Sequence, residues 1–92
     1  MAQKRIHIFV TGRVQGVFFR QSTKVMAIKN NLNGWVRNLD DGRVEIVAEG
    51  EKQNIENLVN WCKTGPANSR VDEFELLEEN STSEFKNFEV RY

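Results

Sequence analysis

The sequence of 92 residues is poor in several residue types, and each shortage excludes a class of protein. Cys62 is the single cysteine, so neither a disulfide framework nor a Cys-x-x-Cys metal or redox motif can form. A lone thiol suits a reducing compartment, and we predict a cytoplasmic protein. No apolar run approaches the ~18 residues of a membrane-spanning helix, and residues 1–5 lack the apolar segment of a signal peptide. We therefore expect no membrane partner.

Net charge is lacking as well. Thirteen basic and thirteen acidic residues cancel to a formal charge of +0. Proteins that bind nucleic acid non-specifically carry a basic face, so we expect no nucleic-acid partner. His7 is the only histidine. No neighbour in the sequence could orient it, and alternation in its strand places it opposite the core, near solvent. We do not assign it a general-base role.

Hydrophobic periodicity predicts one domain over residues 1–92, with five strands and two helices. The expected strands cover about residues 4–12, 34–39, 43–49, 70–78 and 86–92, and the expected helices about 20–30 and 52–63. Cys62 falls on the apolar stripe of the second helix and is predicted to be a buried core residue. Asn31, just after the first helix, is expected to adopt a left-handed conformation. The order of elements predicts an α+β, ferredoxin-like split βαβ fold (βαββαβ), with two helices packed on one face of an antiparallel sheet.

The segment Gly12–Arg20 joins the first strand to the first helix, and it has the features of an anion-binding loop. Two glycines allow backbone conformations in which successive N–H groups point into one concavity. The helix that follows adds its unpaired first-turn donors, and Arg20 can pair with phosphate oxygens through two N–H groups. The Gly-Lys-Ser/Thr of a nucleotide P-loop is missing. A tight turn followed by a surface arginine remains the alternative interpretation.

The turn Asp40-Asp41-Gly42 predicts a hairpin between the second and third strands. Val36 is the natural core residue of the second strand, and Asn38 has the same parity, so its amide should point to the inner side at the strand's end. A buried amide needs hydrogen-bonding partners. Asn38 then either belongs to a site or simply caps the turn. Alternation places Glu45 and Glu49 opposite the apolar residues of the third strand, and Glu45 is interpreted as a solvent-face residue.

Four spaced motifs together resemble the acylphosphatase family over essentially the whole chain. They are Gly12-x-Val14-Gln15-Gly16-Val17-x-Phe19-Arg20, Gly34-Trp35-Val36-Arg37-Asn38, Asp41-Gly42-x-Val44 and Gly65-Pro66-Ala67-x-Ser69-Arg70-Val71. The sequence departs from the family at Asn31, where a glycine is usual. This change lies away from the expected site.

The resemblance implies a metal-independent hydrolase that splits the carboxyl–phosphate anhydride of small acyl phosphates, with inorganic phosphate as product and inhibitor. It implies that Arg20 holds the phosphoryl group and that Asn38 orients the attacking water. It leaves Thr23 as a possible support of the loop and Tyr92 as a terminal carboxylate that could hold Arg20. No cofactor and no metal are implied, and we expect a monomer. Backbone amides of the loop would complete the phosphoryl site: Val14, Gln15, Gly16, Val17, Phe18 and Phe19.

Other functions are compatible with the predicted fold, because this topology serves many purposes. An RNA-binding module of the same topology would need an aromatic pattern that is absent here. A small ligand-sensing domain would usually be fused to an effector domain. A non-catalytic anion- or ligand-binding module remains the main alternative to an enzyme. No pattern in the sequence predicts a pocket for a particular acyl group.

Overall fold

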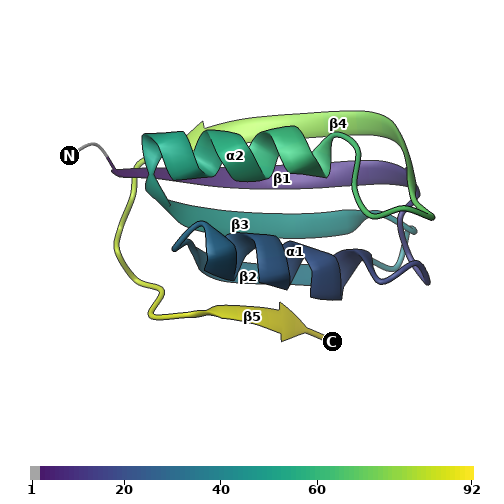
Figure 1. Ribbon diagram of the computed structural model, residues 1–92, viewed down its shortest axis with the longest axis horizontal. Coiled ribbons are helices and arrows are strands. Elements are labelled where there is room, and N and C mark those ends of the chain that lie inside the picture. The colour runs from purple at the N-terminus through teal and green to yellow at the C-terminus, as the bar shows by residue number, and fades with distance from the viewer. Residues whose placement is uncertain (1–2) are drawn as a thin grey trace.

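The computed structural model describes residues 3–92, and within them five strands form one sheet that two α-helices cover on one face (Figure 1). The strands are ordered β4-β1-β3-β2-β5 across the sheet. The predicted ferredoxin-like fold with both helices on one face is confirmed. The elements are β1 (Gln3–Arg13), α1 (Phe19–Lys29), β2 (Asn33–Asn38), β3 (Val44–Glu51), α2 (Lys52–Cys62), β4 (Arg70–Glu79) and β5 (Phe88–Arg91).

The last strand makes the sheet mixed rather than purely antiparallel. β5 pairs parallel with β2, whereas the other neighbouring strands pair antiparallel. The chain reaches this position through residues 80–87, which cross from β4 at one edge of the sheet to β5 at the other (Figure 1). This crossover brings the end of the chain beside β2, the strand that ends in Asn38.

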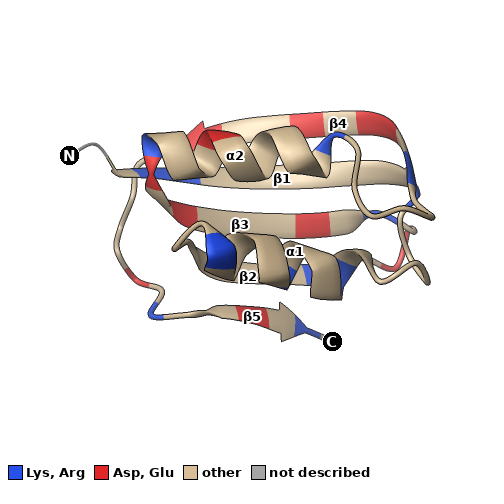
Figure 2. Ribbon diagram, viewed as in Figure 1, with Lys and Arg blue, Asp and Glu red and all other residues tan. Residues whose placement is uncertain are grey.

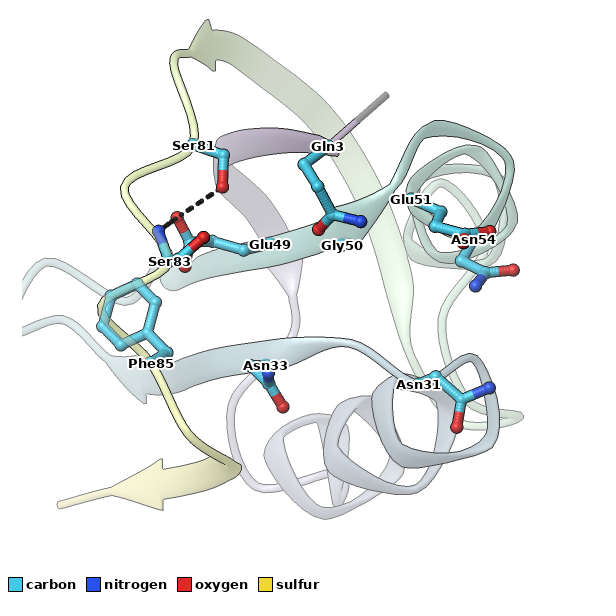
Figure 3. A pocket seen from close by; sticks show the side chains of 10 residues that line it. All are labelled: Gln3, Asn31, Asn33, Glu49, Gly50, Glu51, Asn54, Ser81, Ser83 and Phe85. Atoms are coloured by element: carbon cyan, nitrogen blue, oxygen red, sulfur yellow. Dashed lines mark hydrogen bonds between the residues drawn. The ribbon is translucent and has the colours of Figure 1, made fainter. Parts of the chain in front are cut away.

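A buried carboxylate anchors the crossover. Alternation places Glu49 opposite the apolar residues of β3, yet its side chain is only 4% exposed. Its Oε2 accepts hydrogen bonds from the backbone N–H of Thr82 at 2.9 Å and of Ser83 at 3.3 Å. It also accepts one from the Ser81 hydroxyl at 3.3 Å (Figure 3). The alternation rule failed because the crossover covers this part of β3. Glu49 thereby helps to fix where β5 begins.

The core lies between the sheet and the two helices. Alternate apolar side chains of the strands pack there against the apolar face of each helix. Asn31 has φ 55°, the predicted left-handed conformation, and Cys62 is fully buried, as predicted. Burial raises the pKa of the Cys62 thiol. The buried apolar residues include Ile6, Ile8 and Val10 of β1, Val44, Ile46 and Ala48 of β3, Phe19 and Ala27 of α1, and Ile55, Leu58 and Cys62 of α2.

The opposite face of the sheet holds a second departure from the expected pattern. Glu45 is 6% exposed and not on a solvent face, because neighbouring side chains of β1 and β2 cover it. One carboxylate oxygen lies 2.6 Å from His7 Nε2, and the other accepts a 2.6 Å hydrogen bond from Arg37 Nε. Burial acts to raise the pKa of Glu45, but the hydrogen bonds from Arg37 and His7 outweigh it and lower that pKa. His7 is thus half-buried in an ion-pair network.

None of the helices in the described residues has the length and apolar character needed to cross a membrane.

Candidate active site

The loop between β1 and α1 starts at an irregularity in the sheet. The register of β1 against β4 shifts between Thr11 and Gly12. Gly12 has φ 135°, and a Cβ there would lie 2.1 Å from the carbonyl oxygen of Arg70. Only glycine fits such a close approach. Beyond the bulge, β1 stays paired with β4 through Arg13, and the chain then enters the segment 14–18.

The backbone of this segment is curved directly before α1. Gly16 has φ 74° and Phe18 has φ 63°, so two left-handed residues curve the chain. The first backbone hydrogen bond of the helix runs from the N–H of Ser22 to the carbonyl of Phe18 at 3.0 Å. Among residues 3–92, no hydrogen bond uses the backbone N–H groups of residues 15–18. The geometry therefore provides a curved row of donors at the positive end of a helix, which suits an anion.

The side chain of Gln15 ties this loop to the hairpin that follows Asn38. Its Nε2 donates to the carbonyl of Leu39 at 2.8 Å and to the carbonyl of Arg43 at 2.9 Å. The two carbonyls belong to opposite ends of the β2–β3 turn, so one amide holds both. The family resemblance implies only a backbone role for Gln15. The side-chain partners lie 24 and 28 residues away, so no local pattern in the sequence indicates this tether.

Some of the predicted site residues line one cavity of about 220 Å³, whereas Val14, Gln15, Val17 and Phe19 are not on its lining. Arg20 from the first turn of α1 and Asn38 from the end of β2 both line it. The side chains of Val14, Val17 and Phe19 are buried in the core, so these residues can offer only their backbone to a ligand. The cavity is lined by Gly16, Phe18, Arg20, Gln21, Asn38, Val90 and Tyr92.

Arg20 is held by the end of the chain. Its Nη1 donates to the carbonyl oxygen of Arg91 at 3.3 Å, and its Cζ lies 4.6 Å from the centre of the Tyr92 ring. Within the described residues, the ion pairs do not include one between Arg20 and the terminal carboxylate, which the resemblance had suggested as its support. The backbone carbonyl and the aromatic ring provide the contacts instead.

Asn38 has an unusual environment. Its Oδ1 is buried and accepts no hydrogen bond from the described residues. The turn that follows is closed by other groups: the N–H of Leu39 donates to the carbonyl of Arg43 at 2.8 Å, and Asp41 Oδ1 accepts from the N–H of Arg43 at 3.1 Å. Asp41 therefore caps the turn, and Asn38 does not. A buried acceptor without a partner is costly and calls for an explanation, and a ligand in the cavity would supply one.

Two further residues from the sequence analysis lie outside the cavity. Thr23 is fully buried, and its hydroxyl donates to the carbonyl of Phe19 at 2.8 Å, so it supports the first turn of α1 from inside. His7 lies on the opposite face of the sheet, paired with Glu45. Among residues 3–92, no three His, Cys, Asp or Glu side chains gather in a way that could hold a metal ion.

The edge strand β4 and the helix α1 differ in charge. The charged residues of β4 are mostly acidic, whereas α1 carries basic residues and no acidic one (Figure 2). β4 and β5 form opposite edges of the sheet, so the cavity beside α1 and β5 is remote from the acidic edge. Among the described lining residues, Arg20 brings a positive side chain to the cavity although the chain has zero net charge, and a local positive charge attracts anions.

A larger cavity of about 320 Å³ lies beside the crossover (Figure 3). Its polar side chains come mostly from amide, hydroxyl and carboxylate groups, including Glu49 and Glu51, and no Arg or Lys lines it. This cavity therefore suits an anion poorly. The hydrogen bonds of Glu49 to residues 81–83 give it a structural role.

A model of the acylphosphatase family matches residues 6–90. The chain belongs to the acylphosphatase family. It is 46% identical over 89 residues to the acylphosphatase of Syntrophus aciditrophicus, covering 97% of this chain and 93% of that protein. It is 51% identical over 88 residues to the acylphosphatase of Rubrobacter xylanophilus, covering 96% and 80% respectively. The crystal structure of acylphosphatase from Bacillus subtilis is similar with a TM-score of 0.93 at 40% identity, covering 97% of this chain and 99% of that one. The predicted family and enzyme class are thereby confirmed.

Proposed function

We propose that this acylphosphatase-family chain hydrolyses acyl phosphates at the cavity between the loop 14–18, α1 and β5. The observation that carries the assignment to this cavity is the meeting of Arg20 and the unpartnered amide oxygen of Asn38 beside the free loop donors. The proposed products are a carboxylate and inorganic phosphate. Phosphate would bind to the same groups and act as a competitive inhibitor.

The chemistry of the leaving group explains how so few groups suffice. A carboxylate has a conjugate acid with a pKa of about 4, so it departs without a proton donor. Phosphoryl transition states are loose and depend on positioning and charge stabilisation. Neither a general acid nor a metal ion is needed for this step. A phosphate monoester has a poorer leaving group and would require one of them.

In this mechanism the loop amides and Arg20 hold the phosphoryl oxygens. The guanidinium can donate two N–H groups in one plane to a phosphate, and the contacts with Arg91 and Tyr92 keep it at the cavity. By analogy with an oxyanion hole, each well-placed donor lowers the barrier by about 3–4 kcal/mol. Because the donors are built into the backbone, little reorganisation accompanies the reaction.

Asn38 is proposed to orient the attacking water. Its buried Oδ1 can accept a hydrogen bond from that water. The amide is too weakly basic to remove a proton beforehand, but a loose phosphoryl centre needs little activation of the nucleophile. The Gln15 tether holds the hairpin against the loop, and so fixes Asn38 relative to the phosphoryl site.

We further propose that residues 1–92 act as a single cytoplasmic domain, monomeric and without a cofactor.

Steady-state hydrolysis of benzoyl phosphate, followed with and without EDTA and with increasing inorganic phosphate, tests the function. We expect turnover that EDTA does not change and competitive inhibition by phosphate. Loss of turnover on EDTA, restored by Mg²⁺ or Zn²⁺, would contradict metal independence. Phosphate binding without turnover would instead favour the non-catalytic anion-binding module.

A further inference from the structure

Phe18, an aromatic residue beside the cavity, has an exposure, a backbone conformation and a helix position that are each unfavourable for stability. Phe18 is 79% exposed, whereas its neighbour Phe19 is 1% exposed in the core. The backbone of Phe18 has φ 63° and ψ 25°. This left-handed conformation is favourable for glycine, is tolerated by Asn and Asp, and is unfavourable for most other residues. Phe18 also occupies the N-cap of α1 without a capping hydrogen bond, a position where Asn, Asp or Ser is preferred.

The packing of the fold does not account for this residue. An exposed ring in a strained backbone adds nothing to the core, and a small polar residue would serve the helix better. Such departures are expected at functional positions, where stability gives way to activity. Phe18 lies on the lining of the cavity that contains Arg20 and Asn38. Its ring is therefore available to a substrate held there.

The chemistry of the substrate indicates what this ring contacts. An acyl phosphate has a charged phosphoryl end, for which the loop amides and Arg20 are suited, and an acyl end that carries the remaining group. Three apolar or aromatic side chains line the cavity. Phe18 directly precedes α1, Val90 lies in β5, and Tyr92 follows β5. The Arg20 guanidinium lies over the Tyr92 ring, with its Cζ 4.6 Å from the ring centre, whereas the ring of Phe18 is exposed beside the cavity and is free to meet an acyl group.

We propose that Phe18 is a specificity-determining residue, and that an apolar or aromatic acyl group packs against its ring during hydrolysis. The inference rests on the proposed function and adds to it the chemical class of the acyl group. A small acyl group such as acetyl would gain little from the ring, because it has little apolar surface to bury. A benzoyl group offers a flat aromatic face for offset or edge-on packing.

The test compares kcat/KM for benzoyl phosphate and acetyl phosphate in the wild-type chain and in three variants. Phe18→Asn removes the ring but suits both the left-handed backbone and the N-cap, so it should fold with an equal or higher Tm. We expect the benzoyl-to-acetyl ratio to fall roughly five- to tenfold, as for the loss of one aromatic contact. Phe18→Tyr keeps the ring and should keep the ratio. Val25→Asn alters a residue of α1 that is 63% exposed and outside the cavity, and should change neither rate.

Two results would overturn the inference. Unchanged kcat/KM values on both substrates in Phe18→Asn would show that the ring does not contact the acyl group. An equal loss on both substrates would show that Phe18 acts only by shaping the loop. If the wild-type chain hydrolyses neither substrate, the proposed function itself fails, and this outcome differs from both of the others.

Discussion

The tether between the phosphate loop and the hairpin gives a prediction whose size can be worked out from the structure. Gln15→Leu removes two hydrogen bonds, to the carbonyls of Leu39 and Arg43, while keeping a side chain of similar volume. Both carbonyls retain a backbone partner, Gly42 N–H at 3.1 Å and Leu39 N–H at 2.8 Å respectively. No acceptor is therefore left unpaired, and the loss should be near the net value of two ordinary hydrogen bonds, about 1–2 kcal/mol.

Thermal and chemical denaturation measure this loss. In a domain of this size, 1 kcal/mol shifts the Tm by about 4–8 °C, so we expect a fall of roughly 5–12 °C. Gln53→Leu is the matched control, because Gln53 is exposed on α2 and its hydrogen bond to Asn57 is long, at 3.3 Å. It should change the free energy of unfolding by less than about 0.5 kcal/mol.

Activity should respond more strongly than stability. The loop carries the phosphoryl donors and the hairpin follows Asn38, so a loose tether displaces one part of the site against the other. Misplacement of reacting groups by about 1 Å can cost 100-fold in rate, and we expect at least a tenfold loss of kcat/KM on benzoyl phosphate. If Gln15→Leu is as stable and as active as Gln53→Leu, the tether has no role and the reasoning is wrong.

Three further predictions concern charge. Arg20→Gln should lower kcat and weaken phosphate inhibition, whereas Arg13→Gln, exposed at the end of β1, should have a small effect; the reverse ranking would place the wrong arginine in the site. Because the pKa of Glu45 is lowered in the folded chain, its stabilisation is present at neutral pH and is lost as the pH falls through that lowered value. Urea unfolding between pH 3 and 7 should therefore be less pH-dependent in Glu45→Gln, and parallel curves would contradict this. Tyr92→Ala should raise the phosphate inhibition constant roughly two- to fivefold, as for one exposed cation–π contact. A short extension beyond Tyr92 should change it little, and the opposite ranking would restore the terminal carboxylate as the support of Arg20.

Much of the fold follows from local pattern. The strands of the core show strict alternation, as in Ile6, Ile8 and Val10, and the stripe of α2 predicted the burial of Cys62 correctly. The turn at the glycines of the loop between β1 and α1, and the position of Arg20 after it, are likewise determined by residues close together in the sequence. Those features could therefore be predicted without coordinates.

The features that differ from the sequence-based predictions have one physical cause, which is contact between segments far apart in the chain. Glu45 and Glu49 alternate with the apolar residues of β3, but side chains of neighbouring strands bury Glu45 and the crossover buries Glu49. The parallel pairing of β5 with β2 depends on where that crossover leads. The side-chain partners of Gln15 and the contacts of Arg20 with Arg91 and Tyr92 are likewise non-local. Periodicity carries no information on such pairs.

The most direct test of the proposed mechanism is one set of measurements on Asn38→Ala: kcat, the phosphate inhibition constant and Tm. The substitution removes the group proposed to orient the water and none that holds the phosphoryl group, so kcat should fall steeply while the inhibition constant stays nearly constant. It also removes a buried acceptor that has no partner in the described chain, so Tm should hold or rise. A turn cap would behave oppositely, with a stability loss of about 0.5–2 kcal/mol and an almost unchanged kcat. A destabilised but fully active Asn38→Ala variant would contradict the mechanism.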